Sequence, residues 1–362
     1  MTAHANIPQD TPAWKIWTKW LLRIAGLFLA VWMIRRLLTP MAERDGLSSF
    51  QAMRNLFAGT EAHLVAIAFA VYGFVQVLGA WRWRVLLQMQ GISVSGWDVF
   101  RLTLIGGFFN TVLVGAVTGD LIKMGFILEH APQKRPEAAF TLVLDRYFGL
   151  FGLLLVAMAT SLAMMALQPT LLQNRIVLLA TVLVWAIGTT LASFAFLAVW
   201  RKRLQRLAPA AVLLRKARAV LPAKATILLT RLVHTVDNCR QAPHACSKVL
   251  LLCAIIHLCL GGEAFLLGRA FHETTMSLLQ YLVATPMGNA SSILPLTPGG
   301  IGIRDAVTAA LFQAFQANPI DTAYLIPLAY TAIFIAWGLL GGLCLFLPAS
   351  SNGTKNHTTT AP

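Results

Sequence analysis

Charged side chains are scarce in this sequence. Only 12% of its 362 residues are charged, whereas 57% are hydrophobic. A typical soluble domain carries about 25% charged residues, so this composition excludes an ordinary soluble protein. We therefore predict an all-α polytopic membrane protein, because a helix satisfies its own backbone hydrogen bonds in lipid.

Acidic residues are scarcer than basic residues. There are 14 Asp and Glu against 29 Lys and Arg, which gives a net charge of +15. Nucleic acid would suit such an excess, but the basic residues are concentrated between apolar segments. Residues 201–248 contain eleven Lys or Arg and one acid. This is typical of a cytoplasmic loop, so we expect contact with anionic inner-leaflet lipids and no nucleic-acid partner.

Catalytic and metal-binding motifs are missing as well. The sequence contains no HExxH and no GxxxxGK[ST], and no Ser-His-Asp arrangement stands out. Its five cysteines form no CxxC pair, so we expect reduced thiols that pack in the core. We accordingly expect no enzyme activity, no metal and no cofactor.

Glycine and proline, by contrast, form two breaks in the apolar sequence. The clearer break, residues 291–305, reads SSILPLTPGGIGIRD. Proline removes a backbone donor and glycine permits left-handed dihedrals, so no regular helix crosses Thr297 to Gly300. We expect a helix to restart at Ile301 with its positive end in the break, which suits an anion. A plain surface loop is the alternative. A weaker copy of the break covers residues 106–123.

Six stretches are apolar and long enough to cross a membrane, which takes about 20 residues. The expected spans are residues 17–38, 62–80, 140–167, 175–199, 249–268 and 322–347. We expect the second span to end at an interface anchor, Trp81-Arg82-Trp83-Arg84.

The basic residues set the expected orientation of these spans. With residues 201–248 in the cytoplasm, both ends of residues 99–129 lie on the cytoplasmic face, and both ends of residues 278–316 lie outside. Each of these two segments is therefore predicted to be a re-entrant broken-helix hairpin. The second half then repeats the first in inverted orientation, which is a transporter plan.

This reading also gives the organisation of the chain. We expect a plasma (inner) membrane protein with both termini in the cytoplasm. The expected segments are a disordered N-terminus (1–16), the first membrane repeat together with the span that opens the second (17–199), a basic cytoplasmic linker (200–248), the rest of the second repeat (249–347) and a disordered tail (348–362).

Three motifs occur in order along the chain: Asn110 through Gly119-Asp120, then Asp145-Arg146, then residues 297–305. In them the sequence resembles the lysylphosphatidylglycerol synthase transmembrane, or flippase-like, family, from about residue 20 to 347. It departs from the family where Val114 replaces a frequent proline. The resemblance implies movement of a lipid or lipid-linked molecule between leaflets. Only fifteen residues follow Leu347, so we expect the soluble synthase domain of the fused family members to be absent.

Charged and amide residues near the breaks are the candidate site. An arginine here could contact a phosphate, and its neighbouring acid could be its partner or could accept a headgroup amine. The alternative for Asp145 and Arg146 is a structural ion pair that ties their span to the hairpin, through Lys123 or Asp120. The candidate substrate-binding residues are Asn110, Gly119, Asp120, Lys123, Asp145, Arg146, Pro298, Gly299, Gly300, Gly302, Arg304 and Asp305. We expect the two hairpins to bring both breaks toward one midplane cavity.

Glu263 and His257 are a further candidate within the span 249–268. They form either a proton relay or a buried hydrogen-bonded contact.

Taken together, these features predict translocation of a phospholipid, or of a lipid-linked anionic or aminoacylated molecule, between leaflets. One alternative is a membrane-embedded transferase acting on a lipid-linked sugar or aminoacyl group, with Asp120 or Asp145 as its base. Another is an accessory subunit of a lipid or envelope biosynthetic enzyme. The membrane lipid is the expected partner, and a homodimer or a biosynthetic enzyme stays open as a second one.

Overall fold

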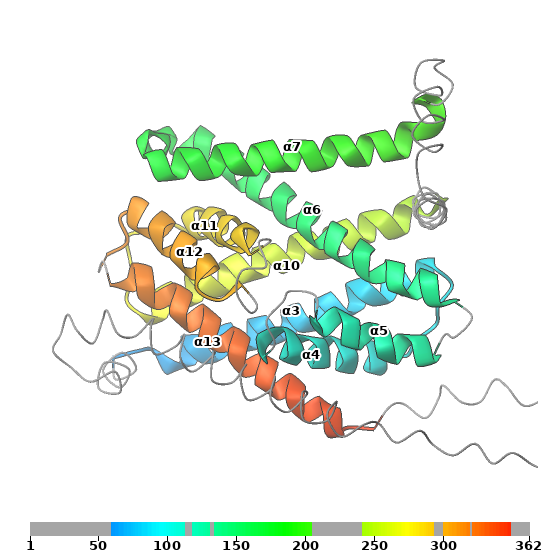
Figure 1. Cartoon of the computed structure of the whole chain (residues 1–362). Coiled ribbons are helices and arrows are strands. Elements are labelled where there is room, and N and C mark those ends of the chain that lie inside the picture. The colour runs from blue at the N-terminus through cyan, green and yellow to red at the C-terminus, as the bar shows by residue number, and fades with distance from the viewer. Residues whose placement is uncertain are drawn as a thin grey trace, which may run out of the picture.

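The computed structural model describes residues 59–112, 118–130, 134–204, 241–292, 300–318 and 321–348. Within these ranges the regular elements are all helices, which confirms the all-α prediction (Figure 1). The helices are α3 (Ala62–Met89), α4 (Gly96–Val112), α5 (Thr118–His130), α6 (Arg135–Leu167), η2 (Pro169–Gln173), α7 (Arg175–Leu204), α10 (Pro243–Ala270), α11 (Leu278–Ser291), α12 (Ile303–Ala314), α13 (Thr322–Leu343) and η4 (Cys344–Phe346).

Five of the described helices are long and apolar enough to cross a membrane: α3, α6, α7, α10 and α13. The protein is therefore a multi-pass membrane protein. These helices coincide with five of the six expected spans. The sixth, residues 17–38, lies outside the described residues, as do the N-terminus (1–16), residues 205–240 of the basic linker and the tail from residue 349.

The end of the first described span differs from the prediction. Helix α3 continues to Met89 instead of ending near residue 80, so Arg82 and Trp83 lie inside the helix bundle. The Trp83 side chain is only 2% exposed, and its indole N–H donates to Thr141 of α6. The expected interface anchor is therefore wrong for these two residues, because the helix that carries them extends further than its most apolar part.

The remaining four α-helices of the described residues are shorter and form two pairs, α4 with α5 and α11 with α12. They contain 17, 13, 14 and 12 residues respectively. At 1.5 Å per residue they are about 18 to 26 Å long, shorter than a hydrocarbon core of about 30 Å.

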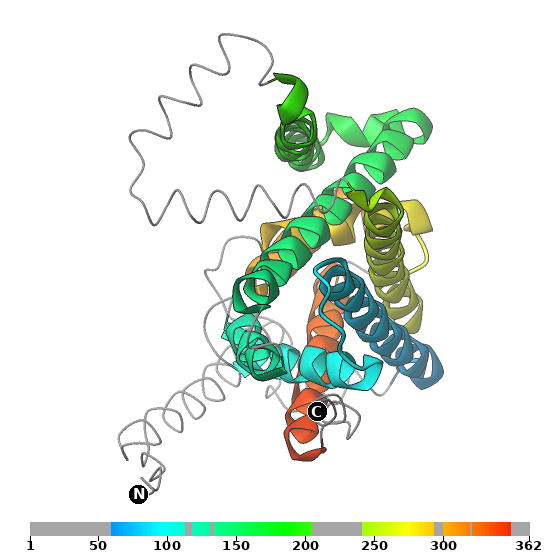
Figure 2. The ribbon, with the colours of Figure 1, turned by 90° about the vertical axis from the view of Figure 1, so that its right-hand side faces the viewer.

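The helix contacts follow one pattern twice. Helix α3 packs on α4 as α10 packs on α11, and α5 packs on α6 as α12 packs on α13. Across the halves, α13 packs on α4 while α6 packs on α11, and α3 packs directly on α10 (Figures 1 and 2). Helices α3 and α10 are antiparallel, since the Glu61 N–H donates to the Ala270 carbonyl at 3.2 Å.

Glycines allow the closest of these contacts. On α13, a methyl group added at Gly341 would collide with the main-chain carbonyl of Leu104 in α4, and one added at Gly338 would collide with Thr111. Small residues let helix backbones approach closely in a membrane protein. These two glycines therefore hold the last span against the first hairpin.

Candidate functional site

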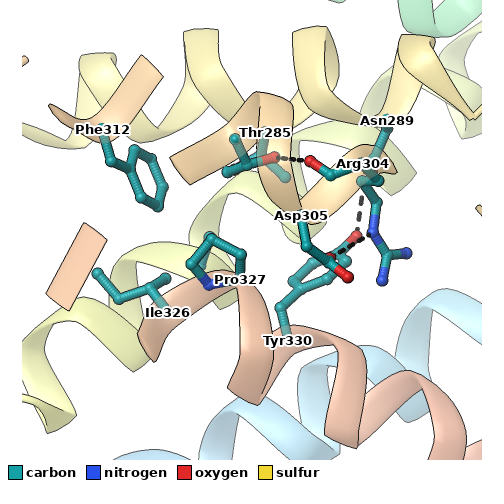
Figure 3. A pocket seen from close by; sticks show the side chains of 10 residues that line it. Thr285, Asn289, Arg304, Asp305, Phe312, Ile326, Pro327 and Tyr330 are labelled. Carbon is teal, nitrogen blue, oxygen red and sulfur yellow. Dashed lines mark hydrogen bonds and ion pairs between the residues drawn. The ribbon is translucent and has the colours of Figure 1, made fainter. Parts of the chain in front are cut away.

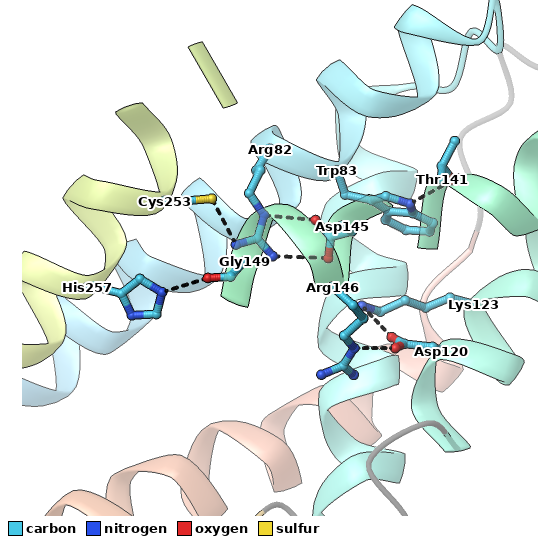
Figure 4. A network of polar contacts seen from close by, with 10 residues as sticks. All are labelled: Arg82, Trp83, Asp120, Lys123, Thr141, Asp145, Arg146, Gly149, Cys253 and His257. Carbon is cyan, nitrogen blue, oxygen red and sulfur yellow. Dashed lines mark hydrogen bonds and ion pairs between the residues drawn. The ribbon is translucent and has the colours of Figure 1, made fainter. Parts of the chain in front are cut away.

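Ten charged or polar residues carry the candidate chemistry, and they form two clusters. The first cluster consists of Arg82, Asp120, Lys123, Asp145 and Arg146, from α3, α5 and α6 (Figure 4). The second consists of Asn289, Arg304, Asp305, Tyr330 and Thr331, from α11, α12 and α13.

In the first cluster, Asp145 is paired with Arg82. The Arg82 Nε donates to Asp145 Oδ1 at 2.8 Å, and Nη2 donates to Oδ2 at 3.0 Å. Such a bidentate arginine–carboxylate pair is both strong and geometrically specific. Each side chain is 14% exposed. The pairing of Asp145 with its neighbour Arg146, one of the alternatives that the sequence left open, is therefore not the one that forms. Adjacent helical residues project about 100° apart, so they face different helices.

Arg146 instead joins its span to the first hairpin. Its Nε donates to Asp120 Oδ2 of α5 at 2.6 Å, and Lys123 Nζ lies 3.5 Å from the other carboxylate oxygen. Asp120 stands in the first turn of α5, where the helix dipole favours an acid. The Asp120 side chain is almost buried, whereas that of Arg146 is 54% exposed. Arg146 is thus the most exposed cation of this cluster.

Asn110 and Gly119 close the first hairpin. The Gly119 backbone N–H donates to Asn110 Oδ1 at 2.9 Å. A methyl group at Gly119 would collide with the carbonyl oxygen of Gly106, so α5 begins directly against the backbone of α4. Both candidate residues act on the backbone here, and they set the position of Asp120.

The second cluster is centred on Asp305 (Figure 3). Its Oδ2 accepts the backbone N–H of Gly302 at 2.9 Å, which caps the start of α12. Its Oδ1 accepts Arg304 Nε at 3.2 Å and the Thr331 hydroxyl at 2.7 Å. The Thr331 hydroxyl also accepts a hydrogen bond from Arg304 Nη2. These bonds fasten the restarting helix to α13.

Arg304 is 6% exposed, and aromatic rings cover its guanidinium. The guanidinium carbon lies 4.8 Å from the ring centroid of Tyr330 and 5.4 Å from that of Phe334. A cation in the first turn of a helix opposes the dipole, and this cation is compensated by Asp305 and by the two ring faces.

A small cavity of about 10 Å³ adjoins this cluster. That volume suits about one water molecule. Its lining residues are Ala264, Thr285, Asn289, Arg304, Asp305, Thr308, Phe312, Ile326, Pro327 and Tyr330 (Figure 3). No residue of the first cluster lines this cavity. Residues 113–117 and 293–299, which form the two breaks, lie outside the described residues, so the single midplane cavity stays a prediction.

The sequence matches the family model of the lysylphosphatidylglycerol synthase TM region over residues 20–344. The protein belongs to this family. A comparison with individual curated proteins gave no match. Membership associates the protein with a function in membrane lipids.

The family's glycine-rich motif is only partly described. Gly300 and Gly302 have φ angles of +74° and +92°, values that only glycine adopts readily. The helix was predicted to restart at Ile301, but it begins at Ile303, because Gly302 still has a left-handed backbone. Pro298 and Gly299 lie outside the described residues. The prediction that they contribute to the site stays a prediction.

Four residues of the clusters were not among the candidate substrate-binding residues: Arg82, Asn289, Tyr330 and Thr331. Arg82 gave a usable signal, an arginine next to a long apolar run whose helix could continue. Tyr330 and Thr331 gave none, because aromatic and hydroxyl residues are ordinary within a span. Only packing of α13 against α12 brings them to Arg304 and Asp305.

The structure does not pair His257 with Glu263. They are six residues apart on α10, whereas helical neighbours are three or four apart. A ring nitrogen of His257 lies 3.3 Å from the Gly149 carbonyl oxygen, but both Glu263 carboxylate oxygens lack a hydrogen-bond partner among the described residues. A direct relay between the two is therefore wrong.

Proposed function

We propose that this protein moves a phospholipid, or a lipid-linked anionic molecule, between the two leaflets of the plasma membrane. The observation that carries the proposal is the exposure of Arg146. Nine residues separate it from Glu137, where the membrane-spanning part of α6 begins, so it lies about 14 Å along the span. The span Glu137–Leu167 has 31 residues and is about 47 Å long, so Arg146 lies about a third of the way along it, inside the apolar segment.

A cation at such a depth requires an anion or water. Insertion of an arginine at the centre of a membrane helix costs about 2.5–3.5 kcal/mol on insertion scales, and more by other estimates. The other charged side chains of the first cluster are at most 14% exposed, whereas Arg146 is paired with Asp120 through its Nε and is still 54% exposed. The exposed guanidinium of Arg146 is therefore the group that would receive a lipid phosphate, which arginine binds well.

The arrangement of the halves supports a transport cycle. The duplicated contact pattern suits two inverted repeats, and the four short helices suit two re-entrant hairpins. Thr331 lies nine residues after Thr322, so the second cluster is also about 14 Å along its span. Each half thus carries a polar cluster at about the same distance from the start of its last span, which suits a repeat in which one half can open while the other is closed.

The same contacts speak against a transferase. Asp120 and Asp145, the acids that could serve as a base, each face at least one cation at 2.6 to 3.5 Å. A paired carboxylate is a weak general base. We accordingly propose a transporter without enzyme activity.

Leaflet exchange in reconstituted liposomes tests this function. Liposomes of anionic phospholipid would carry a labelled analogue of the same headgroup, and a zwitterionic analogue would serve as the second arm. Arg146→Ala should abolish exchange of the anionic analogue. The fold should persist, because Asp120 keeps Lys123 as its partner. The matched control is Arg175→Ala, an exposed arginine at the start of α7, which should exchange lipid at the wild-type rate.

Two results would oppose the proposal. One is unchanged exchange in a folded Arg146→Ala protein. The other is the absence of exchange of either analogue by the wild-type protein. That result would favour the alternative of an accessory subunit of a biosynthetic enzyme.

A further inference from the structure

Among the acids of the described residues, Glu263 is the one that is buried without a hydrogen bond to offset the cost of burial. It is 0% exposed, and neither carboxylate oxygen has a hydrogen-bond partner there. An ionised carboxylate in this setting would be strongly unfavourable, whereas a neutral carboxyl group costs far less to bury. Glu263 therefore carries a proton in this conformation.

Comparison of the two halves of the protein shows what is unusual about the position of Glu263. Helices α3 and α10 both contain 28 residues, and they pack antiparallel on each other. Counted from Ala62 and Pro243, Arg82 and Glu263 occupy the same position. In the first half, Arg82 is neutralised by Asp145 of α6. The corresponding helix of the second half, α13, offers the phenol of Tyr330 instead of a charge.

The surroundings of Glu263 contain one cation that acts on it, Arg304 of α12. Tyr72 of α3, Tyr330 of α13 and Cys259 of α10 itself are the other titratable groups that interact with it. Helix α11 contributes Thr285 and Asn289 to the adjoining cavity, and neither titrates. Helix α6 meets α10 about 9 Å further along, where Gly149 contacts His257.

Arg304 therefore has an adjacent acid, Asp305, and interacts electrostatically with a second acid, Glu263. In the described conformation, Arg304 is bound by Asp305 and Thr331, and this cluster adjoins a cavity the size of a water molecule. Loss of the Glu263 proton would create a second carboxylate that competes with Asp305 for Arg304. Weakening of the Arg304–Asp305–Thr331 contacts would release α12 from α13.

We propose that Glu263 binds and releases one proton in each transport cycle, and that this couples lipid movement to the transmembrane proton gradient. The proposal rests on the translocation function argued above. The protonated acid leaves Arg304 with Asp305 and Thr331 and keeps the second cluster closed. The ionised acid draws Arg304 away from them and releases α12 from α13, so the charge of Glu263 sets whether the cluster is closed or open. A ligand that binds one of two states shifts the balance between them by its differential affinity.

Infrared spectroscopy tests the proton directly and does not depend on transport. The purified full-length protein should show the carbonyl stretch of a buried protonated carboxyl group at neutral pH. Glu263→Gln should remove that band. The control Glu137→Gln, at an exposed residue in the first turn of α6, should retain it. A difference spectrum without a protonated-carboxyl band at Glu263 would overturn the proposal.

Liposomes with an imposed pH difference test the coupling. One pH unit coupled to one proton sustains at most about a tenfold lipid ratio between leaflets. Wild type and Glu137→Gln should accumulate labelled anionic lipid in one leaflet, and reversal of the gradient should reverse the accumulation. Glu263→Gln should lose this accumulation completely.

The outcomes separate the two hypotheses. Wild-type exchange that ignores the gradient would refute the coupling while leaving translocation intact, and this measurement needs no variant. A folded Glu263→Gln protein that still follows the gradient would also refute it. No wild-type exchange under any condition removes translocation itself, and the coupling with it.

Discussion

The pair formed by Arg82 and Asp145 should be the most sensitive ionic contact of the fold. Both side chains are 14% exposed, and two hydrogen bonds of 2.8 and 3.0 Å join them. Arg82→Ala leaves the carboxylate of Asp145 buried without this partner. Breaking a buried pair in this way typically costs about 3–5 kcal/mol. Since domains are stable by about 5–15 kcal/mol, the variant should lose a large share of its stability.

A double-mutant cycle separates this loss from general damage. Arg82→Ala and Asp145→Ala should each destabilise the protein, and the double variant should be more stable than the sum of the two losses predicts. A coupling energy of about 0.5–3 kcal/mol is expected for groups in contact. The free energy of unfolding would be measured by denaturant titration in mixed micelles.

Arg146→Ala provides the internal comparison. The Arg146 side chain is 54% exposed, compared with 14% for Arg82, and Lys123 remains beside Asp120 after the substitution. The loss should be well below that of Arg82→Ala. Additive losses in the cycle, or an Arg82→Ala protein within about 1 kcal/mol of wild type, would refute the assignment of Arg82 as the principal partner of Asp145.

Three further predictions concern packing, pH and topology. Gly341→Ala should destabilise by about 1–3 kcal/mol, because its methyl group collides with a main-chain carbonyl of α4, whereas Gly262→Ala, which meets open space, should be neutral or stabilising in the same unfolding assay. Although burial raises the pKa of Glu273, hydrogen bonds from Thr275, Tyr281 and Met276 outweigh this effect and hold it below its usual value. Its stabilising contribution should therefore be complete above the unfolded-state pKa and disappear as the pH falls through the folded-state pKa, and Glu273→Gln should abolish this part of the pH dependence of unfolding. In a cysteine-free background, Thr274→Cys should react with an impermeant reagent from outside and Gly91→Cys only after permeabilisation; labelling of both from one side would refute the orientation.

The polarity and spacing of the sequence predicted much of the fold. Apolar stretches of about 20 residues identified five of the helices that are long enough to cross a membrane, because the bilayer requires backbone hydrogen bonds within the segment. Gly300 predicted a left-handed backbone in the break before α12, because other residues rarely adopt it. The left-handed Gly302 moves the start of α12 beyond the predicted Ile301 to Ile303. The three short motifs also indicated the family that the comparison then identified.

The partners of the charged residues were decided by tertiary packing alone. A sequence shows that Asp145 and Arg146 are adjacent, but their side chains leave the helix in different directions and meet α3 and α5 respectively. Likewise, Thr331 reaches Asp305 only because α13 packs on α12. Which buried charge finds a counterion depends on helix crossings, and these depend on where small residues such as Gly341 permit close approach. The sequence therefore determined which segments enter the membrane and where they break, whereas the crossings left Arg146 exposed and Glu263 buried without a hydrogen-bond partner in the described residues.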